Sequence, residues 1–286
     1  MSDARHIPAA TAPSQAEADD SGPGLSLWER IEPAMLGIGS IIALLLIWEL
    51  VPRIMTLSPG MKLFFTTPSL IAAAIWKMFA DGTIWAPLSV SASGFAIGLG
   101  LSILVGLPLG VIIGRSRTLN SMLDPFITAF NATPRLVFLP LVMVWLGLGL
   151  SAKVLIVFIG AVFPILINTY EGVRNADRLL INVVRSFGGG EWAIARLVVI
   201  PNAMPYIIAG LRLAVGRAVL GVVVAEFFGS EDGLGVMMMQ AAGRYQVDIV
   251  FSGLVIFAVL SLAMTALVQM LENRVSRWRP PQLKEF

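Results

Sequence analysis

The sequence contains no cysteine and a single histidine, His6. Without cysteine the chain has no disulfides, no thiolate metal ligands and no cysteine nucleophile. A Ser-His-Asp triad would have to recruit His6, which lies in a polar stretch near the N-terminus. We therefore expect no catalytic residue, no cofactor and no bound metal in this chain.

A phosphate-binding loop of the form G-x-x-x-x-G-K-[ST] is also missing. The densest glycine run, Gly188-Gly189-Gly190, is followed by Glu191 and Trp192 rather than by lysine. The sequence therefore does not predict that the chain binds ATP itself, and we expect it not to be an enzyme.

Charge is scarce as well: 13% of the residues are charged, 57% are hydrophobic and the mean hydropathy is +0.83. This balance is far from that of a soluble domain and predicts an integral membrane protein surrounded by lipid. The net charge of +2 is small and no basic stripe with interleaved aromatics occurs, so a nucleic-acid partner is not expected.

The N-terminal stretch, residues 1–24, is rich in Ala, Ser, Pro, Asp and Gly and lacks the apolar segment of a signal peptide. We expect residues 1–30 to form a disordered cytoplasmic tail. Residues 31–279 would form the transmembrane domain, and residues 280–286 a short C-terminal tail.

Apolar runs long enough to cross a bilayer as helices predict six spans. They cover Ala34–Val51, Ser89–Ile113, Ser121–Leu146, Val154–Tyr170, Tyr206–Phe228 and Ile249–Leu271. The third should be bent or broken, because it contains Pro125, Pro134 and Pro140. Between the first two spans, Leu70–Phe79 is too short to cross and predicts a short helix at the membrane surface, with Pro68 and Ser69 at its start.

The distribution of Lys and Arg predicts the orientation. With the N-terminus in the cytoplasm, the inner side would hold twelve basic residues: Arg5, Arg30, Arg115, Arg117, Arg174, Arg178, Arg185, Arg196, Arg274, Arg277, Arg279 and Lys284. The outer side would hold five: Arg53, Lys62, Lys77, Lys153 and Arg244. This bias places both termini and residues 182–205 inside.

Glycines recur at intervals of four in the second span, at Gly94 and Gly98 and again at Gly106, Gly110 and Gly114. That spacing puts them on one helix face, where another backbone can approach closely. The face could form a seam between two copies of the chain, but packing within one copy is the favoured interpretation.

The stretch NVVRSFGGGEWAIARLVVIPNAMP, residues 182–205, is polar and glycine-rich and lies between two apolar runs. The positions of Gly188 and Pro201, with Val198 and Ile200 between them, resemble the core of the EAA loop of ABC-importer permeases. Further resemblance to the nitrate, sulfonate, taurine and bicarbonate branch of that family extends from about Thr67 to Trp278. It is carried by PSLIAAAIWKMF, GLPLGVIIGRSRTLNSMLDPFI, LPLVMVWLGLGLSAKVLIVFIGAVFPILINTYEGVRNAD, PYIIAGLRLAVGRAVLGVVVAEFF and GLGVMMMQAAGRYQVDIVFSGLVI.

The resemblance implies an all-α, polytopic protein with six transmembrane helices and the type I ABC importer permease fold. It also implies a homodimer in the bacterial cytoplasmic membrane, two ATP-binding subunits that dock under residues 182–205, and an external solute-binding protein. The cargo would be a small, anionic solute such as nitrate, a sulfonate or taurine. One departure is that the loop opens with Asn182-Val183-Val184, where the family usually has Glu-Ala-Ala.

By the same resemblance, five residues would couple the chain to the ATPase: Arg185, Ser186, Gly188, Glu191 and Pro201. The docking helix would cover Arg185–Ala195. Gly188 would permit the turn and the close approach of a partner surface. Taken alone, without the flanking resemblance, Gly188 and Pro201 are better explained as ordinary loop residues.

Candidate pathway residues are Arg135, Arg217, Glu226, Met237 and Met238. A charge within a span is costly and tends to face a cavity or a partner. Arg217 is about 18 Å from Pro205 along a helix, near mid-membrane. Arg135 and Arg217 could attract an anion, or each could instead fix helix packing. The methionines could form a flexible apolar gate or ordinary core.

An alternative is an ion-coupled carrier or a membrane scaffold that works without an ATPase. A carrier should have acidic or histidine residues at mid-membrane, whereas Glu49, Asp124, Glu171 and Glu226 all lie near the ends of spans. A scaffold would not need the structured inner loop.

Overall fold

The computed structural model describes residues 27–54, 58, 60 and 64–275, and the regular elements in this part of the chain are helical. The predicted all-α class is therefore confirmed. The chain divides into two compact units, Met1–Ile54 and Met55–Phe286. In the first, α1 covers Leu27–Ile54 and so begins before the predicted end of the N-terminal tail. His6 and residues 280–286 lie outside the described residues.

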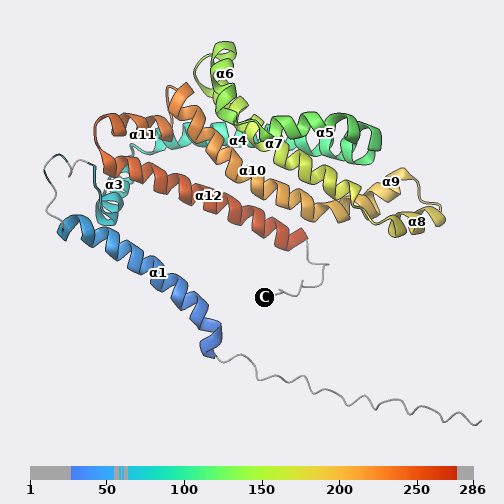
Figure 1. Ribbon diagram of the computed structural model, residues 1–286, viewed down its shortest axis with the longest axis horizontal. Helices are drawn as coiled ribbons and strands as arrows, with labels where there is room; N and C mark the ends of the chain where they lie inside the picture. Colours follow the sequence, from blue (N-terminus) through green and yellow to red (C-terminus); the bar gives the residue numbers. More distant parts are fainter. Residues whose placement is uncertain (1–26, 55–57, 59, 61–63, 276–286) are drawn as a thin grey trace, which may run out of the picture. The chain divides into compact units, whose positions relative to one another are not determined.

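The helices of the second unit follow one another with short connections (Figure 1). Their bounds are α3 Pro68–Ala80, α4 Trp85–Arg115, α5 Arg117–Ala132, η1 Arg135–Phe138, α6 Leu139–Leu146, α7 Leu150–Arg174, α8 Arg178–Ser186, α9 Glu191–Ile194, η2 Ala195–Val199, α10 Ile200–Gly229, α11 Leu234–Gly243 and α12 Val247–Val275.

Within the described residues, five helical stretches are long and apolar enough to cross a membrane, and a bent pair supplies a sixth. The five are Met35–Ile54, Trp85–Arg115, Leu150–Arg174, Glu191–Gly229 and Val247–Arg274. All six predicted spans thus have a counterpart. The fifth differs most, because it begins at Glu191 rather than at Tyr206, and α9, the π-helical turn η2 and α10 form one continuous helical stretch. The short helix predicted over Leu70–Phe79 is α3.

The third span is broken, as its prolines predict. α5 and the segment Leu136–Leu146 meet at 86°. The break falls at Thr133, which is extended (φ −69°, ψ 128°), because the ring of Pro134 disfavours the helical conformation of the residue before it. Pro125 is accommodated inside α5, and Pro140 lies in the first turn of α6, where its missing N–H costs nothing.

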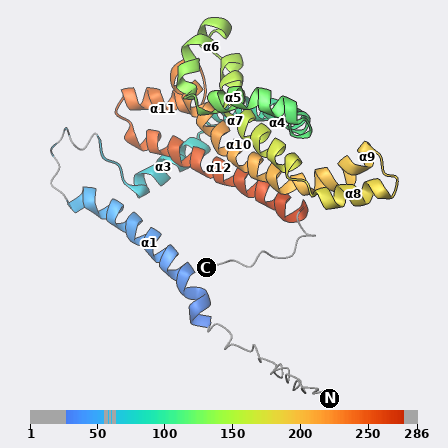
Figure 2. The same cartoon turned by 45° about the vertical axis from the view of Figure 1, so that its right-hand side comes forward.

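The glycine face of α4 packs against α7 within the same chain, which confirms the favoured interpretation. From one end of the seam to the other, Gly94, Gly98, Gly106, Gly110 and Gly114 contact Lys153, Val157, Ile165, Thr169 and Val173. A Cβ at Gly98 would lie 2.6 Å from the Cβ of Val157. The other face of α7 meets α10 in the same way, since Gly221 has no room for a Cβ beside Val157. Three long helices therefore pack with their backbones close together (Figures 1 and 2).

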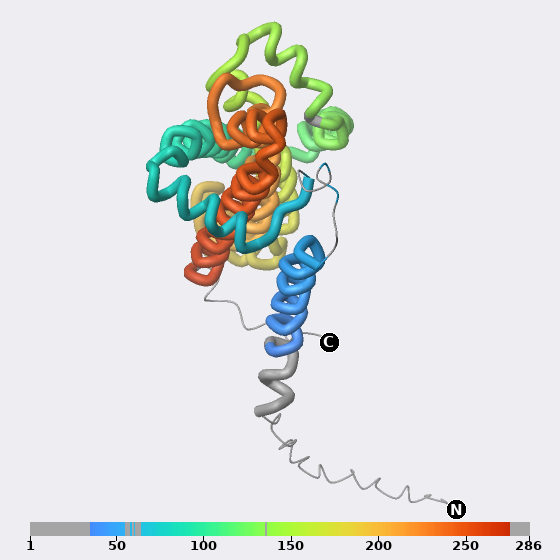
Figure 3. The backbone as a smooth tube through the Cα atoms, turned by 90° about the vertical axis from the view of Figure 1, so that its left-hand side faces the viewer, coloured from blue at the N-terminus to red at the C-terminus, as the bar shows by residue number. Residues whose placement is uncertain are grey.

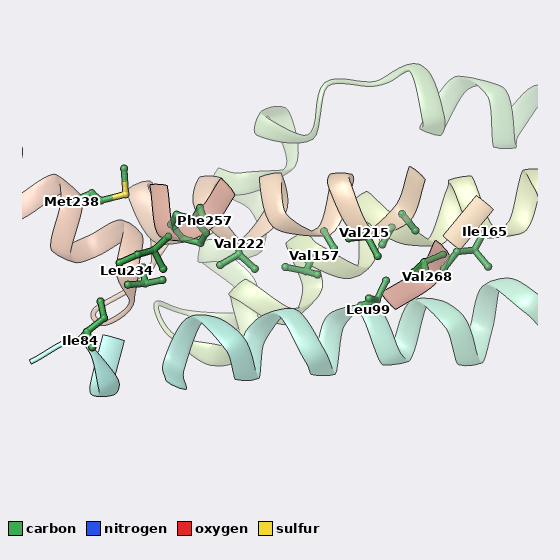
Figure 4. Packing of buried hydrophobic residues seen from close by; sticks show 14 of the residues in the cluster. Ile84, Leu99, Val157, Ile165, Val215, Val222, Leu234, Met238, Phe257 and Val268 are labelled. Carbon is green, nitrogen blue, oxygen red and sulfur yellow. The ribbon is translucent and has the colours of Figure 1, made fainter. Parts of the chain in front are cut away.

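The apolar core runs along these helices and continues into α11 and α12. Val157 of α7, Val215 and Val222 of α10 and Leu234 of α11 are almost completely buried, and Phe257 of α12 packs with them (Figure 4). α3 lies across α12 (Figure 3), where the hydroxyl of Ser252 donates to the carbonyl of Ile71 at 3.4 Å. Helices α8 and α9 lie at one end of this bundle and α11 at the other (Figures 1 and 2).

Candidate functional site

Helix α8 and the turn after it form the segment for which a docking role is predicted. Asp177 caps the helix, because its Oδ1 accepts from the backbone N–H of Leu179 at 2.7 Å. The helix ends at Ser186, whose hydroxyl donates to the carbonyl of Val183 at 2.9 Å. Gly188 has φ +79°, a left-handed conformation that glycine adopts without strain. The N–H of Gly189 then returns to the carbonyl of Val184 at 2.9 Å, which closes the turn.

This geometry corrects the predicted docking helix. Arg185–Ala195 is not one helix: it contains the end of α8, the turn over Phe187–Gly190 and the beginning of the next helix at Glu191. The left-handed conformation at Gly188 ends α8, and the start signal that we overlooked is the cap residue Asp177. Pro201 does not lie in a loop either, because it occupies the first turn of α10.

Glu191 brings two helix ends together at this turn. Its Oε1 accepts from Nη2 of Arg185 at 3.1 Å, and its Oε2 accepts from Nη2 of Arg115 at 2.9 Å. Of the five predicted coupling residues, Arg185 and Glu191 are thus in direct contact, and Ser186 and Gly188 lie between them along the chain. Arg115 is the last residue of α4, so the pairs tie the turn to the bundle. All three side chains are 46–66% exposed, so each pair adds little stability.

The opposite face of α8 is apolar and open. Leu179, Leu180 and Val183 are exposed there, and the side chain of Phe187, at the end of the helix, is 87% exposed. Trp192, in α9, is 75% exposed. A cluster of large apolar side chains of this kind at the end of a membrane bundle marks a surface that meets another protein or lipid.

At the other end of the bundle, Glu226 is the centre of a buried polar cluster. Lys153 Nζ donates to Glu226 Oε1 at 2.6 Å, and the two side chains are 1% and 0% exposed. The hydroxyl of Ser91 donates to the same carboxylate, at 2.7 and 2.9 Å from its two oxygens. The N–H of Gly235 donates to Glu226 Oε2 at 2.8 Å. Four elements, α4, α7, α10 and α11, therefore meet at one carboxylate.

Lys153 and Ser91 complete this cluster, and sequence reasoning missed both. Lys153 also donates to the carbonyl of Asp232 at 3.2 Å, and Ser91 accepts from the N–H of Leu234 at 2.9 Å. Lys153 is one of the five basic residues predicted for the outer side, and its side chain is buried. Both carboxylate oxygens, the Lys153 ammonium and the Ser91 hydroxyl have hydrogen-bond partners, so the arrangement suits a structural role better than contact with a solute.

The two arginines of the fifth span contact residues other than Glu226. Arg217 Nη1 donates to Asn131 Oδ1 of α5 at 2.7 Å, and Arg217 is half-buried. Arg212, on the same helix as Arg217, is paired with Glu272 of α12. Arg135 opens η1 beside the break in the third span; its side chain lies outside the described part of the structure.

The two methionines belong to the packing of the bundle. Met238 is 6% exposed and covers Gly253 of α12, and Met237 packs against the same core. Both lie on α11 beside the Glu226 cluster. Among the described residues, no group of three or more His, Asp or Glu side chains is placed to hold a metal ion.

Comparison with known proteins gives a consistent result. Residues 106–277 match the family described as binding-protein-dependent transport system inner membrane component. A putative aliphatic sulfonates transport permease of Escherichia coli (strain K12) is 34% identical over 90% of this chain and 95% of its own length. The taurine transport system permease of the same strain is 28% identical over 88% and 92%.

A solved structure shares the fold. A chain of the MetNI methionine ABC transporter in an inward-facing conformation superposes with a TM-score of 0.55, at 20% identity, over 77% of this chain and 99% of that one. A helical bundle with six candidate spans and a family match over more than half of the sequence agree with one another. The chain belongs to the family of binding-protein-dependent transport system inner membrane components, as a permease subunit of an ABC importer with the type I fold.

Proposed function

We propose that this permease works as a homodimer with two ATP-binding subunits and an external solute-binding protein, and that it carries a small anionic solute of the sulfonate class. ATP would be hydrolysed by the partner subunits. The observation that carries the proposal is the open apolar face of α8 together with Phe187 and Trp192, at one end of the bundle and ordered by the Gly188 turn.

This face has the properties of a docking surface. Its aromatic side chains are large and exposed, and such residues supply most of the energy of many protein interfaces. α8 is held in place by the Asp177 cap and by the bonds of Glu191, so that a partner meets an ordered surface. The missing Glu-Ala-Ala opening then matters less, because apolar contact rather than an acidic residue would dominate docking.

The orientation follows from the excess of Lys and Arg on the α8 side. We propose that α8, α9 and both termini are cytoplasmic and that α11 lies on the outer side of the inner membrane. The solute-binding protein would then meet the α11 end. When ATP closes the two motor subunits, the paired α8–α9 segments would move together and the pathway would open outward.

An anionic cargo is supported by the sulfonate and taurine permeases among the relatives. It is also supported by Arg217, whose hydrogen-bond partner Asn131 is neutral, so that its positive charge is not cancelled by that contact. We propose that Arg217 lines the pathway, with Arg135 contributing from the break in the third span.

The test begins with purification of tagged permease from the membrane. We expect an ATPase to accompany it at one motor subunit per copy. Replacing both Phe187 and Trp192 by Asp should abolish that association. The matched control is Gly243→Asp, which adds one acid at the other end of the bundle, where nothing lies within 4 Å. A permease that purifies alone, or that transports without any ATPase, would contradict the assembly.

The cargo is tested with the complete transporter in proteoliposomes, supplied with its binding protein and ATP. Uptake of a labelled alkanesulfonate should be inhibited by unlabelled taurine and other sulfonates, and much less by neutral amino acids. Uptake of a neutral or cationic solute with no competition from sulfonates would overturn the anionic assignment while leaving the ATPase assembly intact.

A further inference from the structure

A basic cleft lies between α8 and the inner ends of α4, α5 and α7. Its volume is about 550 Å³. Five arginines line it, with one acidic side chain among them: Arg115, Arg117, Arg174, Arg178, Arg185 and Glu191. Two of the arginines share the carboxylate of Glu191, which leaves a formal charge of +4, five minus one.

Three of these guanidinium groups have no ion-pair partner in the described part of the chain: Arg117, Arg174 and Arg178. The nearby acid Asp177 is already engaged in capping α8. Exposed arginines that line one cleft and have no carboxylate partner suit a phosphate group, because the planar guanidinium offers parallel donors that match the phosphate oxygens.

The position of the cleft along the membrane helices indicates which phosphate compound can reach it. The candidate spans of α4 and α7 end at Arg115 and Arg174, so the cleft lies where hydrocarbon gives way to lipid headgroups. Basic pockets between membrane helices at this level bind anionic headgroups. The cleft also reaches Asn120 of α5, and its neighbours Leu119, Met122 and Leu123 are exposed apolar side chains that acyl chains can cover.

The two faces of α8 are therefore different in kind. Arg178, Ile181 and Arg185 are three and four residues apart, so they share the face that lines the cleft. Leu179, Val183 and Phe187 lie on the other face and are exposed. An acidic surface of the ATPase would have to reach behind α8 to enter the cleft, whereas a lipid reaches it from the bilayer.

We propose that this cleft is a binding site for a phosphate group, that of an anionic phospholipid headgroup, which would brace the basic face of α8 from behind. The inference rests on the cytoplasmic placement of α8, which thiol labelling tests independently. Free inorganic phosphate offers the same chemistry, and the experiment separates the two sources.

The test uses the transporter complex, permease with ATPase, in detergent and in lipid nanodiscs. Native mass spectrometry would measure retention of phosphatidylglycerol against phosphatidylcholine. We expect preferential retention of phosphatidylglycerol, weakened at least about tenfold in the variant Arg117→Gln/Arg174→Gln/Arg178→Gln, because each basic side chain near a headgroup contributes to binding. Arg274→Gln, an exposed arginine outside the cleft, is the matched control.

Sodium phosphate at constant ionic strength forms the second arm. If it displaces phosphatidylglycerol from the native complex, both ligands share the site. If it stabilises the native complex but not the triple variant, and the lipids show no preference, the cleft binds free phosphate. Should the triple variant misfold, Arg178→Gln alone, on the surface of α8, replaces it.

Binding of free phosphate without a lipid preference would refute the lipid assignment, and two further results would overturn the site itself. One is equal retention of phosphatidylglycerol by native and variant complexes, with no effect of inorganic phosphate on either. The other is a variant that keeps its lipid but loses the ATPase, since the cleft would then belong to the docking surface.

Discussion

Lys153 and Glu226 form an ion pair sealed inside the helix bundle, with Nζ 2.6 Å from Oε1 although the residues are 73 positions apart in the sequence. We expect Lys153→Met to destabilise the permease by about 3–5 kcal/mol, because it leaves a carboxylate buried without its counter-charge. Thermal unfolding of the purified protein measures this. Replacing both residues, Lys153→Met with Glu226→Leu, should recover most of the loss. Glu231→Gln, an exposed acid nearby, should change little; equal losses in all three variants would contradict this account.

The seam between α4 and α7 makes a second prediction. Gly98→Ala should cost about 1–3 kcal/mol, because the new Cβ would lie 2.6 Å from Val157 and 3.0 Å from the backbone carbonyl of Val154. Gly100→Ala, two residues away with nothing within 4 Å, should be neutral or slightly stabilising, since Ala favours helix. Melting temperatures of the two variants compare them directly, and the same value for both would refute close packing at this seam.

The third prediction concerns the turn at Gly188. Gly188→Leu should uncouple transport while the bundle stays folded, because a branched residue resists φ +79° even though nothing lies within 4 Å. Gly188→Asn should be milder, as Asn tolerates this conformation. Gly190→Leu, at φ −78° and also in open space, is the control. Uptake and ATPase association are the measurements; normal values of both in Gly188→Leu would remove the docking assignment.

Substitution of Arg217 tests whether this side chain lines the transport pathway or only packs the helices together. With the neutral Asn131 as its hydrogen-bond partner, Arg217→Gln should slow uptake severalfold yet change stability by only about 1 kcal/mol. Arg212→Gln on the same helix breaks the ion pair with Glu272 and serves as the control, with any loss of uptake following the loss of folded protein. A large fall in melting temperature for Arg217→Gln, with uptake reduced in proportion, would assign it to packing.

The orientation of the permease in the membrane can be measured by thiol labelling of introduced cysteines, because the chain has no native cysteine. Ser186→Cys, at the exposed end of α8, should react with an impermeant thiol reagent only after the membrane is opened. Arg244→Cys, beyond α11, should react in intact cells. Reversed labelling of the two positions would show that the bundle is inserted the other way round.

Sequence patterns within single helices predicted most of the fold. They did not predict contacts between helices that are distant in the sequence. Hydropathy located the spans, and Pro134 located the break through its effect on Thr133. The four-residue glycine spacing identified the packing face of α4. The partners of Glu226 and Arg217 were missed because Lys153 and Asn131 lie on other helices, 73 and 86 positions away, and nothing local in the sequence pairs them. The helix predicted over Arg185–Ala195 is wrong, because the left-handed turn at Gly188 and the helix cap at Asp177 place a helix end within this range and a helix start before it.

The helical stretch that runs from Glu191 to Gly229 contacts α4 near both of its ends, through an exposed ion pair at one end and a buried polar cluster at the other. Glu191 holds Arg115 at the end of α4, and Glu226 holds Ser91 near its start. The glycine contacts with α7 interlock the helices between these two points. Because the glycine contacts and the buried Glu226 cluster hold α4, α7 and α10 close together, we expect these three helices to move as one unit. Bending would then be expected outside this unit, first at the 86° break beside Pro134, where the helix is already interrupted.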